Sequence, residues 1–145
     1  MKFLEASPAD APRLAGITAA TPRSAAWNAA AFTAELKHPF AKIYKLQDEA
    51  GLISAFISYR FEQDSAELTN FAVAPDFLRR GFGRILLGQS LAALKILGVK
   101  NVTLEVNVHN GPALSLYESF GFKQTALRKK FYNNTDDAAL LKVCL

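Results

Sequence analysis

Alternation of apolar and polar residues predicts β-strands along much of the chain. The pattern is cleanest in residues 99–108, where one face is apolar and the other polar, as in a strand that covers a core on one side. The apolar positions are Val102, Leu104, Val106 and Val108, and the polar positions are Thr103, Glu105 and Asn107. Other runs with strand character are residues 2–6, 40–46, 52–61, 66–74, 122–132 and 138–145. We expect the first of these to be a short edge strand.

Turn signals separate several of these runs. Asp48-Glu49-Ala50-Gly51 lies between residues 40–46 and 52–61 and predicts an antiparallel hairpin. Residues 62–65 form the next turn, and residues 133–137 join the last two strands.

Helical spacing and helix-end signals predict two helices before the first hairpin. Asp10 can cap the first helix, with Pro12 in its first turn and with Leu14 and Ile17 on its buried side. A loop over residues 21–26 follows. The second helix begins at Trp27 or Asn28 and runs to about residue 37, where His38-Pro39 ends it. We expect Trp27 and His38 to have structural roles.

Two further helices are predicted after residue 80. One runs over about residues 83–97, with Gly98 as its stop. Its apolar face consists of Leu87, Leu91, Leu94 and Leu97. The other follows Asn110-Gly111-Pro112, with the proline near its N-terminus, and runs to Phe120, where Gly121 ends it.

The order of these elements predicts one α+β domain over residues 1–145, with a mixed, mostly antiparallel sheet flanked by helices. The helix of residues 83–97 connects the strand of residues 66–74 to that of residues 99–108. A crossover of this kind joins parallel strands, so we expect these two strands to pair in parallel.

Composition narrows the class of protein. The chain has 145 residues, half of them apolar, and a formal net charge of +4, which suits a polyanionic small ligand better than nucleic acid. Cys144 is the only cysteine, so no internal disulfide forms and a reducing compartment is expected. No stretch has the length and hydropathy of a membrane span or a secretion signal. We expect the protein to be cytoplasmic. We also expect it to bind no membrane, nucleic acid or metal ion.

The stretch NFAVAPDFLRRGFGRILLG, residues 70–88, contains a candidate anion site. An apolar run turns through Pro75, passes a Gly-x-Gly and enters a helix, so that several backbone N–H groups are unpaired at the helix start. Gly81 and Gly83 let a phosphate approach the backbone, and Arg79, Arg80 and Arg84 add positive charge. The spacing fits neither the dinucleotide fingerprint nor the P-loop, and the same pattern occurs in plain tight turns.

Together with LEVNVHNGPALSLYESFGF, residues 104–122, and the weaker KFYNNTDDAALL, residues 130–141, this stretch resembles the GCN5-related N-acetyltransferase (GNAT) superfamily. The resemblance covers nearly the whole chain and is closest to the RimI-like branch, which acetylates N-terminal alanines of ribosomal proteins. It implies the acyl-coenzyme A N-acyltransferase fold, in which the strands matching residues 68–74 and 103–108 splay apart and the first carries a bulge.

The resemblance implies acetyl-coenzyme A as cofactor and donor. Its pantetheine arm would lie between the splayed strands, along Phe71, Ala72 and Val73, and the Val73 amide would face the thioester carbonyl. The amides of the glycine turn would hold the pyrophosphate, and Asn110 would contact the pantetheine arm. The residues of that turn are Arg79, Arg80, Gly81, Phe82, Gly83 and Arg84.

By the same resemblance, Glu105 is the general base and Tyr117 the general acid. Without the family pattern, a solvated carboxylate and a core aromatic explain the same two residues. A free glutamate, with a pKa of ~4.3, is a poor match for an α-amine at ~8 and a worse one for a lysine amine at ~10.4. The base role therefore requires burial of Glu105 or a bridging water. A free tyrosine at ~10 lies above a thiol at ~8.5, so Tyr117 mostly supplies a hydrogen bond to the leaving sulfur.

Three features depart from the family pattern. Leu78 stands where the motif usually has Gln or Arg, which affects the strength of cofactor binding. The last turn has Phe131-Tyr132 and Asp136-Asp137-Ala138 in place of paired tyrosines and Glu-Asp-Ala, at the expected acceptor site. Asp136 and Asp137 could attract a cationic amine, although acidic turns are commonly only solvated. Cys144 lies in a terminal apolar strand with no histidine partner in view, so direct transfer is favoured over an acetylated cysteine.

Three hypotheses remain for the activity and its acceptor. The first is the N-terminal α-amine of a protein, such as a ribosomal protein, and the second is a small amine, polyamine or free amino acid. The third is a module that binds the coenzyme without catalysis, against which Glu105 and Tyr117 argue. We expect a monomer or weak dimer in each case.

Overall fold

The computed structural model describes residues 1–22, 24–132 and 135–145, except for the side chains of residues 130–132. Seven strands form one sheet in the order β1-β2-β3-β4-β5-β7-β6. Their bounds are Lys2–Glu5 for β1, Ala41–Gln47 for β2, Ile53–Glu62 for β3, Ser65–Val73 for β4, Asn101–Asn107 for β5, Lys123–Tyr132 for β6 and Asp136–Cys144 for β7. Every neighbouring pair is antiparallel except β4 and β5. The predicted α+β class, edge strand, hairpin and parallel pair are confirmed.

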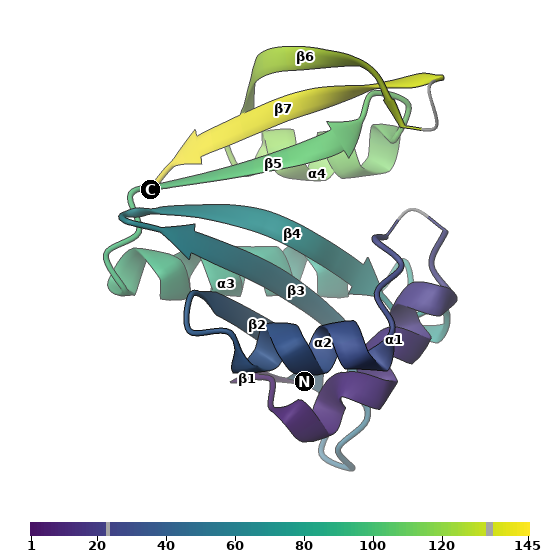
Figure 1. Cartoon of the computed structure of the whole chain (residues 1–145). Helices are drawn as coiled ribbons and strands as arrows, with labels where there is room; N and C mark the ends of the chain where they lie inside the picture. Colours follow the sequence, from purple (N-terminus) through teal and green to yellow (C-terminus); the bar gives the residue numbers. More distant parts are fainter. Residues whose placement is uncertain (23, 133–134) are drawn as a thin grey trace.

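Four α-helices pack on the two faces of this sheet (Figure 1). They are α1 (Ala11–Ala19), α2 (Ala29–Lys37), α3 (Phe82–Ile96) and α4 (Gly111–Ser119), with two short 3-10 turns, η1 (Pro8–Asp10) and η2 (Pro75–Phe77). α1 and α2 cover one face of the β1–β4 half, and α3 covers the other. α4 packs under β5 and β7 on the α3 side. None of the helices in the described ranges is long and apolar enough to cross a membrane.

Each face of the sheet has its own hydrophobic core. Along β3, Ala55, Ile57 and Tyr59 point into the α3 core, while Phe56 between them points into the α1–α2 core. All four are fully buried, as expected for a strand covered on both faces.

Tyr59 carries the one polar group of this strand segment into the α3 core. Its hydroxyl lies 2.7 Å from Ser90 Oγ, and Ser90 donates its own proton to the Leu87 carbonyl, so Tyr59 is the donor to Ser90. Burial raises the pKa of Tyr59, so the phenol stays protonated and can donate this hydrogen bond. The hydrogen bond fixes β3 against α3.

A β-bulge shifts β4 halfway along its length. Leu68 pairs with Tyr59 and Asn70 pairs with Ser58, so Thr69 is an extra residue in the β4 strand. Because side chains alternate along a strand, this insertion exchanges the faces. Beyond it, Phe71 and Val73 pack into the α3 core, whereas Ala72 and Ala74 pack into the α1–α2 core. The family resemblance implied a bulge in this strand, and the register confirms it.

β4 and β5 pair only over their first three residues. The parallel partners are Ser65 with Asn101, Ala66 with Val102 and Glu67 with Thr103. From there the two strands diverge, and Figure 1 shows β4 turning away below β5 toward the right of the view. We call this region, between β4 from Leu68 to Val73 and β5 from Leu104 to Asn107, the wedge. The splayed pair expected from the sequence is present.

Several predictions at element ends were wrong. Asp10 occupies the N-cap position of α1 but makes no cap bond there, because its Oδ2 accepts from the Ser7 amide at 2.9 Å and from Lys45 Nζ at 2.8 Å. Leu97 was predicted to lie on the apolar face of this helix, but α3 ends at Ile96 and Leu97 is 55% exposed. Leu86, which was not placed on that face, is buried. The last connection is shorter than expected, since Asp136 and Asp137 belong to β7. Asn133 and Asn134 lie outside the described residues.

The two ends of the α3 apolar face should therefore differ in their contribution to stability. Leu94→Ala removes a fully buried side chain and should lower the free energy of unfolding by about 2–5 kcal/mol. Leu97→Ala removes the same atoms from an exposed site and should cost less than about 0.5 kcal/mol. Urea unfolding of both variants measures the difference, and equal losses would show that α3 is in another register.

Candidate functional site

The amide of Val73 is directed into the wedge. Ala74 donates its amide to the Ser54 carbonyl of β3 at 2.8 Å, and successive amides of a strand point in opposite directions. The amides of Val73 and Phe71 therefore point away from β3, on the side where β5 has diverged. Ala72, between them, turns its backbone toward β3 and its methyl group into the α1–α2 core. The backbone of this strand segment thus presents alternate groups to an elongated ligand.

The turn after η2 has the backbone shape of an anion site. Arg79 has φ of 63° and Gly81 has φ of 80°, so two residues in the left-handed region precede the first turn of α3. Left-handed residues before a helix start allow successive N–H groups to point the same way, which suits a phosphate. Arg79 is a non-glycine residue in a conformation that L-residues rarely adopt, and such strain is typical of binding sites.

Contacts of the first turn of α3 place this turn beside the wedge. A Cβ on Gly83 would lie 3.5 Å from Val73 Cγ2 and 3.6 Å from Phe71 Cζ, so the helix start rests directly on the wedge strand. Arg84 stacks over Phe120 at 5.6 Å and donates to Ser119 Oγ at 3.1 Å. Its guanidinium therefore contacts the C-terminal end of α4, and its backbone amide is among the N–H groups without an intrahelical partner at the start of α3.

Arg80 and Phe82 both pack against Phe77 of η2. The guanidinium of Arg80 lies 5.5 Å from the centre of the Phe77 ring, and the Phe82 ring lies 6.0 Å from it. These contacts stabilise the conformation of the turn. The predicted turn residues are therefore assembled in one place.

Tyr117 lies on the α3–α4 face of the wedge. It is buried, and its ring is 6.5 Å from that of Phe71 and 5.5 Å from that of Phe122. α4 carries it there, and Asn110 begins that helix by accepting the Ala113 amide at 3.4 Å. The Asn110 side chain thus caps α4 through Oδ1, in addition to the pantetheine contact predicted for it.

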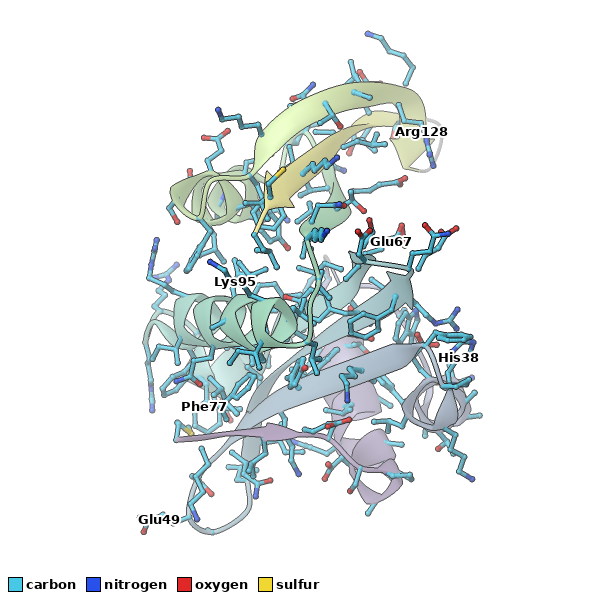
Figure 2. All side chains as sticks on the ribbon, turned by 90° about the vertical axis from the view of Figure 1, so that its left-hand side faces the viewer. His38, Glu49, Glu67, Phe77, Lys95 and Arg128 are labelled. Atoms are coloured by element: carbon cyan, nitrogen blue, oxygen red, sulfur yellow. The ribbon has the colours of Figure 1, made fainter. Side chains whose placement is uncertain are left out.

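Glu105 lies on the opposite face. Val102 and Leu104 point into the α3 core, so Thr103 and Glu105 point to the side of α1 and α2. Glu105 Oε1 is 3.1 Å from Arg128 Nη1, and the carboxylate side chain is 27% exposed. Figure 2 shows Arg128 and Glu67 on the α2 side of the molecule, away from Lys95 of α3. The two predicted catalytic residues therefore flank the wedge from opposite faces.

Cys144 is at the other end of the sheet. It pairs with Asn101, where β4 and β5 are still hydrogen-bonded, so the wedge opens away from it. Among the described residues there is also no group of three or more side chains that could hold a metal ion.

Two residues at the wedge had no role assigned from the sequence. Asn70 is 3% exposed, accepts the Phe71 amide through Oδ1 at 3.0 Å and donates through Nδ2 to the Ala25 carbonyl at 3.1 Å. It ties the segment before α2 to the wedge strand. The sequence feature that could have identified Asn70 is a polar residue inside an otherwise apolar strand. Arg128 had no such signal, because its partner is far away in the sequence.

Comparison with known proteins identifies relatives. A sequence profile described as the acetyltransferase (GNAT) family matches residues 11–122. The ribosomal protein bS18-alanine N-acetyltransferase of Escherichia coli K12 is 41% identical over 86 residues, which are 59% of this chain. That stretch covers 58% of the Escherichia coli protein, so the match spans little more than half of its length.

Solved structures share the fold over its whole length. The crystal structure of the ribosomal-protein-S18-alanine N-acetyltransferase from Escherichia coli has a TM-score of 0.88 at 29% identity and covers 99% of this chain and 92% of that one. A spermidine N-acetyltransferase variant from Vibrio cholerae has a TM-score of 0.85 at 17% identity, covering 99% of this chain and 95% of that one. At that identity, the second structure shows the common fold alone.

Asn70 should be important for stability, and its neighbour Ser58 offers a matched control. Asn70→Ala leaves the Phe71 amide and the Ala25 carbonyl without their partner and should lower the free energy of unfolding by about 2–3 kcal/mol. Ser58 pairs with Asn70 across the strands and is fully buried, but its Oγ has no hydrogen-bond partner among the described residues. Ser58→Ala should therefore leave stability unchanged or raise it by about 1 kcal/mol. Similar losses in both variants, measured by urea unfolding, would contradict this assignment.

Proposed function

The chain belongs to the acetyltransferase (GNAT) family, and we propose that it transfers an acetyl group from acetyl-coenzyme A to the N-terminal α-amine of a protein. The observation that carries this proposal is the wedge, with the Val73 amide directed into it and with Glu105 and Tyr117 on its two faces. An alanine N-terminus is the preferred acceptor, because the Escherichia coli relative at 41% identity is a bS18-alanine N-acetyltransferase.

The residues of the wedge and the glycine turn fit the coenzyme. The turn from Arg79 to Arg84 presents backbone amides to a diphosphate, with left-handed residues at Arg79 and Gly81. Phe71 and Val73 offer alternate backbone groups to the amides of a pantetheine arm, in the manner of a strand added to a sheet edge. The Phe71 amide already bonds to Asn70, so its carbonyl is the group left for such a partner.

Acetyl transfer needs one proton removed and one supplied. The bound coenzyme provides the acetyl group and a thiolate leaving group; the C–N bond to the acceptor forms as the C–S bond breaks. Val73 donates its amide to the carbonyl oxygen as negative charge grows there. Glu105 takes the amine proton, directly or through a water, on the face toward α1 and α2. Tyr117 donates a hydrogen bond to the departing sulfur from the other face.

Acceptor and coenzyme thus approach from opposite faces, which favours direct transfer in a ternary complex. A base on one face and an acid on the other leave no need for a covalent relay through the protein. The runner-up acceptors, small amines and polyamines, would use the same chemistry and differ only in how the α1–α2 face receives them.

Acceptor class is tested by comparing three substrates with acetyl-coenzyme A. We expect turnover with an Ala-starting peptide, none with its N-blocked form and little with spermidine, because an α-amine of pKa ~8 is far more often neutral at pH 7.5 than an amine at ~10.4. Thiol release measures the rate, and mass spectrometry locates the acetyl group. Turnover with spermidine and none with the peptide would replace the proposed acceptor by a polyamine.

Tyr117→Phe should lower kcat by about 100-fold and leave the Kd of acetyl-coenzyme A nearly unchanged, because it removes only the group that assists the leaving sulfur. Tyr59→Phe is the matched control, since it removes a buried hydroxyl that bonds to Ser90 and is assigned no part in catalysis. It should cost stability and leave kcat as in the parent. Steady-state kinetics and calorimetry separate the two effects, and a parental kcat in Tyr117→Phe would remove Tyr117 from the mechanism.

A further inference from the structure

We propose that Arg128 determines acceptor specificity, by neutralising Glu105 and disfavouring polycationic amines at the α1–α2 face of the wedge. This inference rests on the proposed function and concerns the same site. The pairing joins β5 to the edge strand β6 across the intervening β7, so it is formed only in the folded sheet.

Geometry places Arg128 in the path of the acceptor. Its Nη1 is 3.1 Å from Glu105 Oε1, and its side chain is 50% exposed against 27% for Glu105. The guanidinium is therefore the more solvent-facing partner. An amine that approaches Glu105 from solution on this face meets a permanent positive charge beside the carboxylate.

The other carboxylates near this face also have basic neighbours. Asp136 accepts the Asn107 side-chain amide at 2.9 Å and lies 3.8 Å from His109 Nε2. Glu67 pairs across the strands with Arg60, whereas Asp137, which alternates with Asp136 along β7, lies on the opposite face with Lys129. The acidic groups that share the Glu105 face therefore each have a polar or basic neighbour, and Arg128 is the one that contacts Glu105 directly.

Arg60 is itself bound to a second carboxylate. It donates to both carboxylate oxygens of Glu35, at 2.7 and 2.8 Å. Hydrogen bonding to Glu35, together with the charges of Glu35 and Glu67, raises the pKa of Arg60, so its positive charge is permanent. At the α2 end of the face one guanidinium thus serves two carboxylates, whereas the Glu105–Arg128 pair is one to one.

Charge separates the two acceptor classes. A polyamine carries several ammonium groups near neutral pH, whereas an Ala-starting peptide presents one α-amine, of which about a quarter is neutral at pH 7.5. Arg128 cancels the attraction that the Glu105 carboxylate would exert on every ammonium that nears the wedge, and the neutral α-amine is not subject to that attraction. Arg128 itself exchanges no proton in the transfer, so its effect is on acceptor binding and orientation.

The test compares Arg128→Gln with Lys123→Gln, which removes the same charge from an exposed position on the same strand. With the full-length protein, kcat/KM is measured for an Ala-starting peptide and for spermidine. We expect the spermidine-to-peptide ratio to rise about tenfold in Arg128→Gln, mainly through a lower KM for spermidine, and to stay within about twofold in Lys123→Gln. An unchanged ratio in Arg128→Gln overturns the inference.

Arg128→Lys tests charge against packing, and it covers the case in which Arg128→Gln does not fold. The lysine variant should keep the parental ratio, and a rise equal to that of the glutamine variant would show that charge is not the cause. Raising the salt concentration should lower the ratio of Arg128→Gln, because salt screens the attraction of the unpaired Glu105 for the polycation, and should leave the parental ratio nearly constant. If the parent prefers spermidine, the proposed function fails; if it prefers the peptide and Arg128→Gln does also to the same degree, only the role of Arg128 fails.

Discussion

Interrupted pairing between β4 and β5 is the constraint on which the rest of the structure depends. After Glu67 and Thr103 the two strands no longer share hydrogen bonds, although both lie in the middle of a seven-stranded sheet. A buried backbone group without a partner costs about 1–3 kcal/mol, so such a gap persists only where other groups or water satisfy it. Under the proposed function, a ligand with amides of its own, such as a pantetheine arm, would meet this need.

The bulge at Thr69 gives the wedge two different faces. By shifting β4 one residue, it sends Phe71 and Val73 toward α3 and Tyr117, and it places Asn70 under the segment before α2. One inserted residue thus sets which side chains line each face of the wedge. The two cores hold these faces in place, because β3 is buried between them from Ile53 to Tyr59.

Charges on the α1–α2 face of the wedge meet across the sheet. Glu105 pairs with Arg128, Asp136 accepts the Asn107 side-chain amide, and Arg60 lies between Glu35 and Glu67. The fold is common to the solved alanine N-acetyltransferase and the spermidine N-acetyltransferase variant, so the fold alone does not set the acceptor class.

The sequence by itself determined the elements, the parallel crossover and the glycine turn, because helix spacing, strand alternation and glycine signals act within a few residues. The resemblance to a family located Glu105 and Tyr117, and their spacing agreed with the strand and helix that carry them. Only the tertiary structure decided that Asp10 bonds to Lys45, that Leu97 lies outside the core and that Asn70 and Arg128 belong to the site. These depend on strand register and on side chains that meet across the sheet from distant positions, and no local pattern encodes such meetings.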